Sequence, residues 1–114
     1  YILAMDRGHP KLAPQVDGLN PAVLRLIAQT AAGARKHDRP VAVCGAMASD
    51  PQAVPILMGL GIKELSVAVP AIPTIKALIR STSLADARKK ARYALTLDSA
   101  ADVRALHTLE DYEL

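Results

Sequence analysis

Val41-Ala42-Val43-Cys44-Gly45 is a short, continuous apolar run between turn-forming residues. Such a run is typical of a strand that is buried on both faces, as strands of parallel sheets are. Residues 64–69, with the sequence ELSVAV, are a second strand candidate. Stretches with helical spacing of apolar residues precede, separate and follow the two runs. The order helix, strand, helix, strand, helix predicts an α/β fold with a parallel sheet.

The first helix is expected to begin at Asn20-Pro21 and to continue to about residue 35. An Asn side chain accepts hydrogen bonds from free N–H groups at a helix start, and Pro loses no bond at the first helical position. Apolar residues recur at helical spacing behind this start and predict one buried face. They are Val23, Leu24, Ile27, Ala31 and Ala34.

The second helix is expected to open at Asp50-Pro51 and to stop at Gly59 and Gly61. Pro55 lies inside this stretch and predicts a distortion, because proline lacks the N–H that a helix interior needs. A third helix is expected to follow residues 70–73.

Two further helices are expected near the C-terminus, over about 84–96 and 99–111. Ser83 and Ser99 each precede an acid by three positions, which is the pattern of an N-terminal cap. The first of these helices has an expected buried stripe at Leu84, Ala87, Ala91 and Ala94. The basic cluster at residues 88–92 is then a solvated helix face rather than a nucleic-acid site.

The composition excludes several classes of protein. The chain has 114 residues, of which 51% are apolar, and its net charge of +3 does not demand nucleic acid or an anionic membrane. A single cysteine excludes an intrachain disulfide and is ordinary in a reducing cytosol. No apolar run approaches the roughly 18–20 residues of a membrane span. We expect a cytoplasmic protein without membrane insertion, and residues 1–5 begin in mid-pattern, like a segment of a longer protein.

Cys44 is the strongest chemical candidate. A thiol at the C-terminal end of a parallel strand lies at the edge where α/β proteins hold their sites. Gly45 allows a turn there and the close approach of a ligand. The thiol could act as a proton donor or as a nucleophile. The alternative is a buried structural cysteine, the commoner fate of a lone Cys.

Arg7 is the second candidate, in the loop Asp6-Arg7-Gly8. A guanidinium can bind a phosphate or a carboxylate through two parallel hydrogen bonds. The alternative is a surface ion pair with Asp6 or a neighbour. The histidines are scattered and lack the spacing of metal ligands or of a catalytic triad; they are His9, His37 and His107.

Five blocks of sequence occur in order along residues 1–80. They are YILAMDRG at 1–8, NPAVL at 20–24, CG at 44–45 with ASD at 48–50, GLGIKELS at 59–66 and IPTIKALIR at 72–80. Together they resemble the C-terminal part of enzyme I of the bacterial sugar phosphotransferase system, the phosphoenolpyruvate–protein phosphotransferase. The resemblance covers about residues 1–95.

The resemblance implies a fold. Enzymes of this family bind phosphoenolpyruvate (PEP) in a TIM (β/α)8 barrel, of which this chain would be the C-terminal portion. Residues 1–19 would be a loop region after an upstream strand, residues 20–80 two β/α units, and residues 84–112 the C-terminal helices. Because a complete barrel needs about 250 residues, we expect either an open fragment whose flank is covered by self-association, as in a homodimer, or a product of cleavage.

The resemblance also implies a reaction. The phosphoryl group of PEP passes through an enzyme histidine to a histidine phosphocarrier protein, for sugar uptake. By position, Arg7 matches the arginine that holds the substrate, and Cys44 matches the proton donor that completes pyruvate. The phosphorylated histidine belongs to an N-terminal domain, and the Mg²⁺ ligands lie upstream of Tyr1. The fragment alone is therefore expected to be inactive.

Two departures from the family pattern indicate which branch of the family the chain resembles. Ala46 stands where the family usually has Glu, and Ser49 stands where Gly is common. With the Ala-rich and Pro-rich character, they look more like the fused multiphosphoryl transfer proteins of the fructose branch. One alternative is a PEP synthase or pyruvate phosphate dikinase, whose barrels usually keep that Glu and lack the block at residues 72–76. The other is a non-catalytic α/β interaction module.

Overall fold

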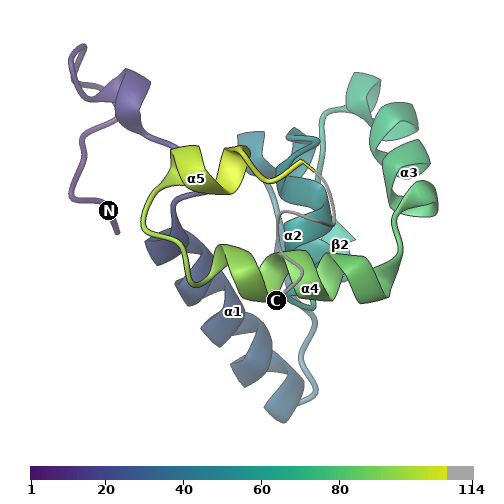
Figure 1. Cartoon of the computed structure of the whole chain (residues 1–114). Coiled ribbons are helices and arrows are strands. Elements are labelled where there is room, and N and C mark those ends of the chain that lie inside the picture. The colour runs from purple at the N-terminus through teal and green to yellow at the C-terminus, as the bar shows by residue number, and fades with distance from the viewer. Residues whose placement is uncertain (108–114) are drawn as a thin grey trace.

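The computed structural model describes residues 1–107, which form a small, mostly helical α/β domain with two short parallel strands (Figure 1). The predicted alternation of helices and strands is confirmed. In order, with η for 3-10 helices, the elements are η1 Ala13–Gln15, α1 Pro21–Lys36, β1 Ala42–Val43, η2 Ala46–Ser49, α2 Ala53–Gly59, β2 Glu64–Leu65, η3 Val69–Ala71, α3 Ile72–Ser81, α4 Leu84–Ala94 and α5 Ala100–Arg104.

Helix α1 begins where the sequence predicts. The Asn20 side chain accepts a hydrogen bond from the N–H of Ala22 at 2.9 Å, and Pro21 occupies the first turn. Of the predicted apolar stripe, Leu24 and Ala31 are buried and the other members are half-buried. The helix therefore turns the predicted face toward the core.

The two strands pair in parallel, as predicted, with Ala42 opposite Glu64 and Val43 opposite Leu65. The prediction of a strand over residues 41–45 that is buried on both faces is wrong, because the strand has two residues and Ala42 is exposed. Within residues 1–107 no third strand covers the pair.

The second predicted strand is also shorter than residues 64–69. After Leu65 the ladder continues by one hydrogen bond, from the N–H of Ser66 to the carbonyl of Val43 at 2.8 Å. Residues 69–71 then form η3, because Pro70 has a fixed φ and no N–H for a sheet.

Helix α2 is the centre of the core, and α4 crosses it (Figure 1). Four residues of α2 are completely buried, namely Ala53, Val54, Ile56 and Leu57. Gly59 lets the two helices touch, because a Cβ there would lie 2.1 Å from the carbonyl oxygen of Ala87 and 2.7 Å from Cβ of Ala91. Buried residues from other segments complete this core, among them Leu19, Leu24, Ile62, Val103 and Leu106.

The predicted distortion at Pro55 is wrong. Helix α2 begins at Ala53, later than the predicted start near Asp50, so Pro55 lies in the first turn. The N–H groups of a first turn have no partner within the helix. The helix therefore loses no hydrogen bond through the missing N–H of Pro55.

The N-terminal caps predicted for the last two helices are both confirmed. The Ser83 side chain accepts from the N–H of Asp86 at 3.4 Å, and the Ser99 side chain accepts from the N–H of Asp102 at 3.1 Å. Helix α5 ends at Arg104, well before the predicted residue 111. Residues 108–112 lie outside the described part of the chain.

Helix α4 buries most, but not all, of its predicted stripe. Ala87, Ala91 and Ala94 are buried, but Leu84 is 47% exposed, because contact with Gly59 of α2 begins only at Ala87. Most of the basic cluster faces water as predicted, although Lys90 is half-buried and donates to the carbonyl of Leu106 at 2.8 Å. Across residues 1–107, no helix has the length and hydropathy of a bilayer span.

Candidate functional site

Cys44 follows β1 directly, and its side chain is exposed. Gly45 has φ +79° and ψ −165°, a conformation that residues with a side chain rarely adopt, and it turns the chain into η2. Two hydrogen bonds close this turn, from Ala48 N–H to the Gly45 carbonyl at 3.1 Å and from Asp50 N–H to the Met47 carbonyl at 3.2 Å. The thiol is therefore open to solvent at the end of a parallel strand, which does not fit a buried structural cysteine.

Arg7 lies in a turn of the N-terminal segment. One carboxylate oxygen of Asp6 accepts from the N–H of Gly8 at 2.8 Å, and the Asp6 carbonyl accepts from the N–H of His9 at 3.0 Å. Within the described residues no ion pair joins Asp6 to Arg7, so the surface-pair alternative is not observed. The guanidinium is exposed and open to an anion.

Within residues 1–107 no hydrogen bond or ion pair joins Arg7 to Cys44. The N-terminal segment runs beyond α1 and α5, on the side of the molecule away from β2 and α3 (Figure 1). The two segments approach each other further along the chain, because a Cβ added at Gly18 would lie 2.6 Å from Cε of Met47. Gly18 thus packs on the turn that follows Cys44. The convergence of both side chains on one substrate stays a prediction.

Sequence reasoning missed a group of polar side chains beside this contact. We call it the Arg104 cluster; it comprises Arg104, Asp17, Asp50 and Gln52. Nε and Nη2 of Arg104 donate to the two carboxylate oxygens of Asp17 at 2.6 and 2.9 Å, and Nη2 also donates to Asp50 at 2.9 Å. Nη1 donates to the Gln52 side chain at 2.8 Å. Arg104 lies 87 positions from Asp17 and 54 from Asp50, so no local pattern could have revealed the group.

The charges of the Arg104 cluster stabilise one another. The hydrogen bond from Arg104 lowers the pKa of Asp17 below its ordinary 3.8, and the N–H of Leu19 acts in the same direction, whereas partial burial opposes both. Hydrogen bonds to Asp17 and Asp50 raise the pKa of Arg104 above its ordinary value. The guanidinium is therefore always charged, and the lowered pKa keeps Asp17 ionised to a lower pH than an isolated aspartate.

A cavity of about 370 Å³ opens beside the Arg104 cluster. It is bounded by the N-terminal segment, by the turn after Cys44 and by α5. Its lining residues are Pro14, Val16, Asp17, Gly18, Leu19, Ala46, Met47, Asp50 and Arg104. The cluster thus forms one wall of the space where the two candidate segments meet.

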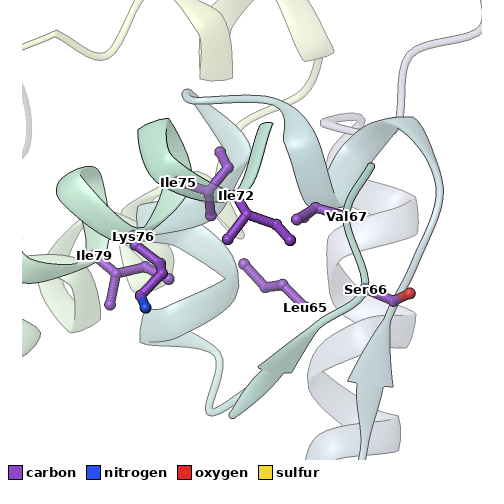
Figure 2. Close-up of a pocket in the computed structure, with 7 residues that line it drawn as sticks. All are labelled: Leu65, Ser66, Val67, Ile72, Ile75, Lys76 and Ile79. Atoms are coloured by element: carbon purple, nitrogen blue, oxygen red, sulfur yellow. The ribbon is translucent and has the colours of Figure 1, made fainter. Parts of the chain in front are cut away.

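A second hollow, also of about 370 Å³, lies between the end of β2 and α3 (Figure 2). Aliphatic side chains from Leu65, Val67, Ile72, Ile75 and Ile79 surround it, together with Lys76. The Ser66 hydroxyl points away from them in Figure 2. With one ammonium group and no carboxylate in its lining, this hollow offers no acid–base pair for catalysis.

Comparison with known families matches residues 1–84 to the PEP-binding domain of PEP-utilising enzymes. The chain belongs to this family. The match includes Arg7, Cys44 and the whole of the two strands, so the PEP-binding domain contains both candidate residues. The resemblance inferred from the five sequence blocks is confirmed.

Individual relatives agree with the family assignment. The domain is 51% identical over 106 residues to a multiphosphoryl transfer protein of Rhodobacter capsulatus and 49% identical over 106 residues to one of Xanthomonas campestris. It is 39% identical over 110 residues to a phosphoenolpyruvate-protein phosphotransferase of Haloferax volcanii. These alignments cover 93% to 96% of this chain but only 13% to 20% of the length of the relatives.

The residues present do not fit the Mg²⁺ that the resemblance implies. Residues 1–107 contain no group of three or more His, Cys, Asp or Glu side chains that could hold a metal ion. Asp17 and Asp50, which line the cavity beside the turn after Cys44, are already paired with the guanidinium of Arg104.

Replacing Asp17 by Asn should make the PEP-binding domain less stable at neutral pH. The change removes an ion pair with two hydrogen bonds, and we expect a loss of about 1–2 kcal/mol in the free energy of unfolding. Since the pKa of Asp17 is lower in the folded than in the unfolded state, the pair stabilises fully above the ordinary value of 3.8 and loses its effect as the pH falls through the folded value. The difference between the variant and the wild type should therefore shrink in acid.

Urea unfolding at pH 7 and at successively lower pH measures this dependence. Asp98→Asn is the matched control, because Asp98 is an exposed acid near α5; it should leave both the stability at pH 7 and the acid dependence unchanged. A destabilisation by Asp17→Asn that stays the same from pH 7 into strong acid would contradict the ion-pair account.

Proposed function

We propose that this chain is the C-terminal part of the PEP-binding barrel of a PEP–protein phosphotransferase, of the fused multiphosphoryl transfer type. The observation that carries the proposal is the family match over residues 1–84, which contains an exposed thiol at the end of a parallel strand and an exposed guanidinium. The 49% and 51% identities to two multiphosphoryl transfer proteins support the finer assignment.

In this proposal residues 20–80 are the last two β/α units of a TIM (β/α)8 barrel, residues 1–19 lead into them and residues 84–112 are C-terminal helices. Parallel pairing of β1 with β2 supports it, since barrel strands are parallel. Exposed apolar side chains beside the sheet also support it: Val69 is 78% and Ile72 39% exposed. We propose that the remainder of the barrel covers such surfaces, and that the intact protein is a homodimer.

The proposed reaction uses the two candidate residues in turn. Arg7 binds the anionic groups of PEP, whose phosphate and carboxylate suit the fork of a guanidinium. The phosphorus–oxygen bond breaks as a phosphorus–nitrogen bond forms to a histidine of another domain, leaving the enolate of pyruvate. The thiol of Cys44 then donates its proton to the terminal carbon of the enolate, which gives pyruvate, and the thiolate regains a proton from water.

The phosphohistidine would next pass its phosphoryl group to a histidine phosphocarrier protein. We place this transfer, and the Mg²⁺ that the reaction would need, on parts of the polypeptide outside this chain. His9, His37 and His107 are all exposed and scattered, and none of them takes the role of phosphoryl acceptor. In this proposal the 114-residue chain alone does not turn over PEP.

Phosphotransfer by the intact polypeptide tests the proposal. Incubation with PEP and a histidine phosphocarrier protein should release one pyruvate for each phosphorylated carrier, without any nucleotide. A requirement for ATP or AMP would assign the protein to the PEP synthase or dikinase class instead. Absence of any turnover of PEP would favour a non-catalytic interaction module.

Replacing Arg7 by Ala in the intact phosphotransferase should chiefly weaken substrate binding. Loss of a bidentate, charge-assisted contact with an anion corresponds to about 2–3 kcal/mol, or a rise in KM for PEP of about 30–150-fold. Steady-state kinetics of pyruvate formation measure it. Lys11→Ala, which removes an exposed cation of the same segment, serves as the control and should leave KM unchanged. An unaltered KM in Arg7→Ala would remove Arg7 from the site.

A further inference from the structure

We propose that Arg104 is a positioning residue, which holds the turn after Cys44 against the segment that carries Arg7. The proposal rests on the proposed function for what these two residues do in catalysis. The structural link itself consists of the contacts of the Arg104 cluster. Arg104 lies outside residues 1–84, the part of the chain that the family match covers.

The first link runs from Arg104 to Cys44. Asp50, which accepts a hydrogen bond from Nη2 of Arg104 at 2.9 Å, comes directly after η2. The bonds from Ala48 to Gly45 and from Asp50 to Met47 join Gly45 and Asp50 through a single 3-10 turn. A displacement of Asp50 is therefore passed to Gly45 and to the neighbouring thiol of Cys44.

The second link runs from Arg104 to the N-terminal segment. Its guanidinium binds both carboxylate oxygens of Asp17, and Asp17 also accepts from the N–H of Leu19 at 2.9 Å. Leu19 is buried, so this end of the segment is fixed in the core just before α1. Gly18 lies between them and packs on Met47, the residue three positions after Cys44. The two acids thus bring the two segments to one guanidinium.

The third link fixes Arg104 itself. Val103 on α5 and Leu106, which lies two residues after Arg104 and beyond the end of α5, are both buried in the core. The side chain of Gln52 donates to the carbonyl of Arg104 at 3.0 Å and accepts from its Nη1 at 2.8 Å. A planar guanidinium can bind carboxylates from two directions in fixed geometry, whereas the ammonium of a lysine cannot reproduce that fork. We call this link between the two segments, made by Arg104 with Asp17 and Asp50, the clamp. The clamp therefore needs arginine and not only positive charge.

The single cysteine of the chain offers a direct test, because a nitroxide spin label can be attached to Cys44 alone. The broadening of amide resonances in the 114-residue chain then reports which residues lie near the label. In the wild type the amides of Gly18 and Leu19 should be broadened. In Arg104→Ala and in Arg104→Lys this broadening should fall about twofold or more. Without the arginine we expect the closed and the open arrangement of the two segments to have about the same free energy, so that the segments are apart about half of the time.

Two further variants complete the test. Arg25→Ala is the matched control. The Arg25 guanidinium likewise makes hydrogen bonds to a distant part of the chain, the carbonyls of Leu95 and Leu97, but it contacts neither acid of the Arg104 cluster. It should leave the broadening at Gly18 unchanged. Asp50→Asn is a second probe of the clamp in case Arg104→Ala fails to fold, since an Asn side chain can still accept from the N–H of Gln52. It should reduce the broadening as Arg104→Ala does.

A kinetic readout separates positioning from stability. In the intact phosphotransferase, Arg104→Ala should lower kcat for pyruvate formation about tenfold with a smaller change in KM, because a misplacement of about 1 Å can cost up to about 100-fold in rate. Arg25→Ala should leave kcat unchanged. Wild-type broadening in both Arg104→Ala and Asp50→Asn would overturn the proposal, and so would wild-type kcat in folded Arg104→Ala. If the wild type itself fails to turn over PEP, the proposed function fails, while the broadening still decides whether the clamp exists.

Discussion

Replacing Cys44 by Ala in the proposed phosphotransferase is expected to slow pyruvate formation by about 10²–10⁴-fold, the usual contribution of a positioned general acid. In the proposed reaction the enolate of pyruvate needs a proton at carbon, and we propose that the thiol at the end of β1 supplies it. Because Cys44 is exposed, its removal leaves no cavity, and the free energy of unfolding should change little. A rapid-mixing assay of pyruvate release measures the rate.

The control for this prediction is Ser81→Ala. Ser81 is another exposed residue with a small polar side chain, at the end of α3, and its loss should leave the rate unchanged. Wild-type rates in Cys44→Ala would remove Cys44 from the reaction and would return the chain to the alternative of an interaction module.

Replacing Gly59 by Ala should be the most damaging single-methyl change in the fold. The new Cβ would lie 2.1 Å from the carbonyl oxygen of Ala87, a backbone atom that no side-chain rotation can move away. Helices α2 and α4 would have to separate, which would disrupt the most extensive helix–helix packing of residues 1–107. We expect a loss of about 3 kcal/mol in the free energy of unfolding, and a fall in Tm of about 10–20 °C.

Gly33 provides the matched control, since it is also a helical glycine but has no atom within 4 Å of where a Cβ would be. Gly33→Ala should stabilise α1 by about 0.5–1 kcal/mol, because alanine favours an exposed helix interior. Thermal unfolding of the two variants should therefore shift in opposite directions. Equal effects of Gly59→Ala and Gly33→Ala would contradict the close contact between α2 and α4.

The features that the sequence predicted well are the local ones. Asn20, Ser83 and Ser99 cap the helices that they were expected to cap, because a cap and its N–H partner are only two or three positions apart. The stop at Gly59 and Gly61 is equally local, since Gly61 has φ +94° and ends the second helix. These caps and this stop could therefore be predicted from one sequence, whereas the start of α2 at Ala53 and the end of α5 at Arg104 were not predicted correctly.

The features that the sequence predicted poorly depend on distant parts of the chain. The apolar run at residues 41–45 indicated a buried strand, yet burial needs neighbouring strands, and Ala42 is exposed beside a sheet of two. Leu84 has the right spacing for the buried stripe of α4 but lies before the turn that contacts α2. Periodicity predicts which side chains share a face, whereas the extent of their burial depends on the packing partner.

The candidate site divides in the same way. Cys44 was predicted to stand at the end of a parallel strand next to a turning glycine, and its exposure and the φ of Gly45 agree with that prediction. The Arg104 cluster could not be predicted, because its acids and its guanidinium come from segments whose proximity only the fold creates. Nothing near Arg104 in the sequence distinguishes it from the other surface cations.

The central claim, that Arg7 and Cys44 serve one PEP molecule, is tested most directly by alkylation of Cys44 in the intact phosphotransferase. Iodoacetamide should label the exposed thiol readily, and saturating PEP should slow the labelling about tenfold or more by covering it. In Arg7→Ala, the PEP concentration that protects the wild type should give almost no protection. Labelling that proceeds at the same rate with and without PEP in the wild type would contradict the account.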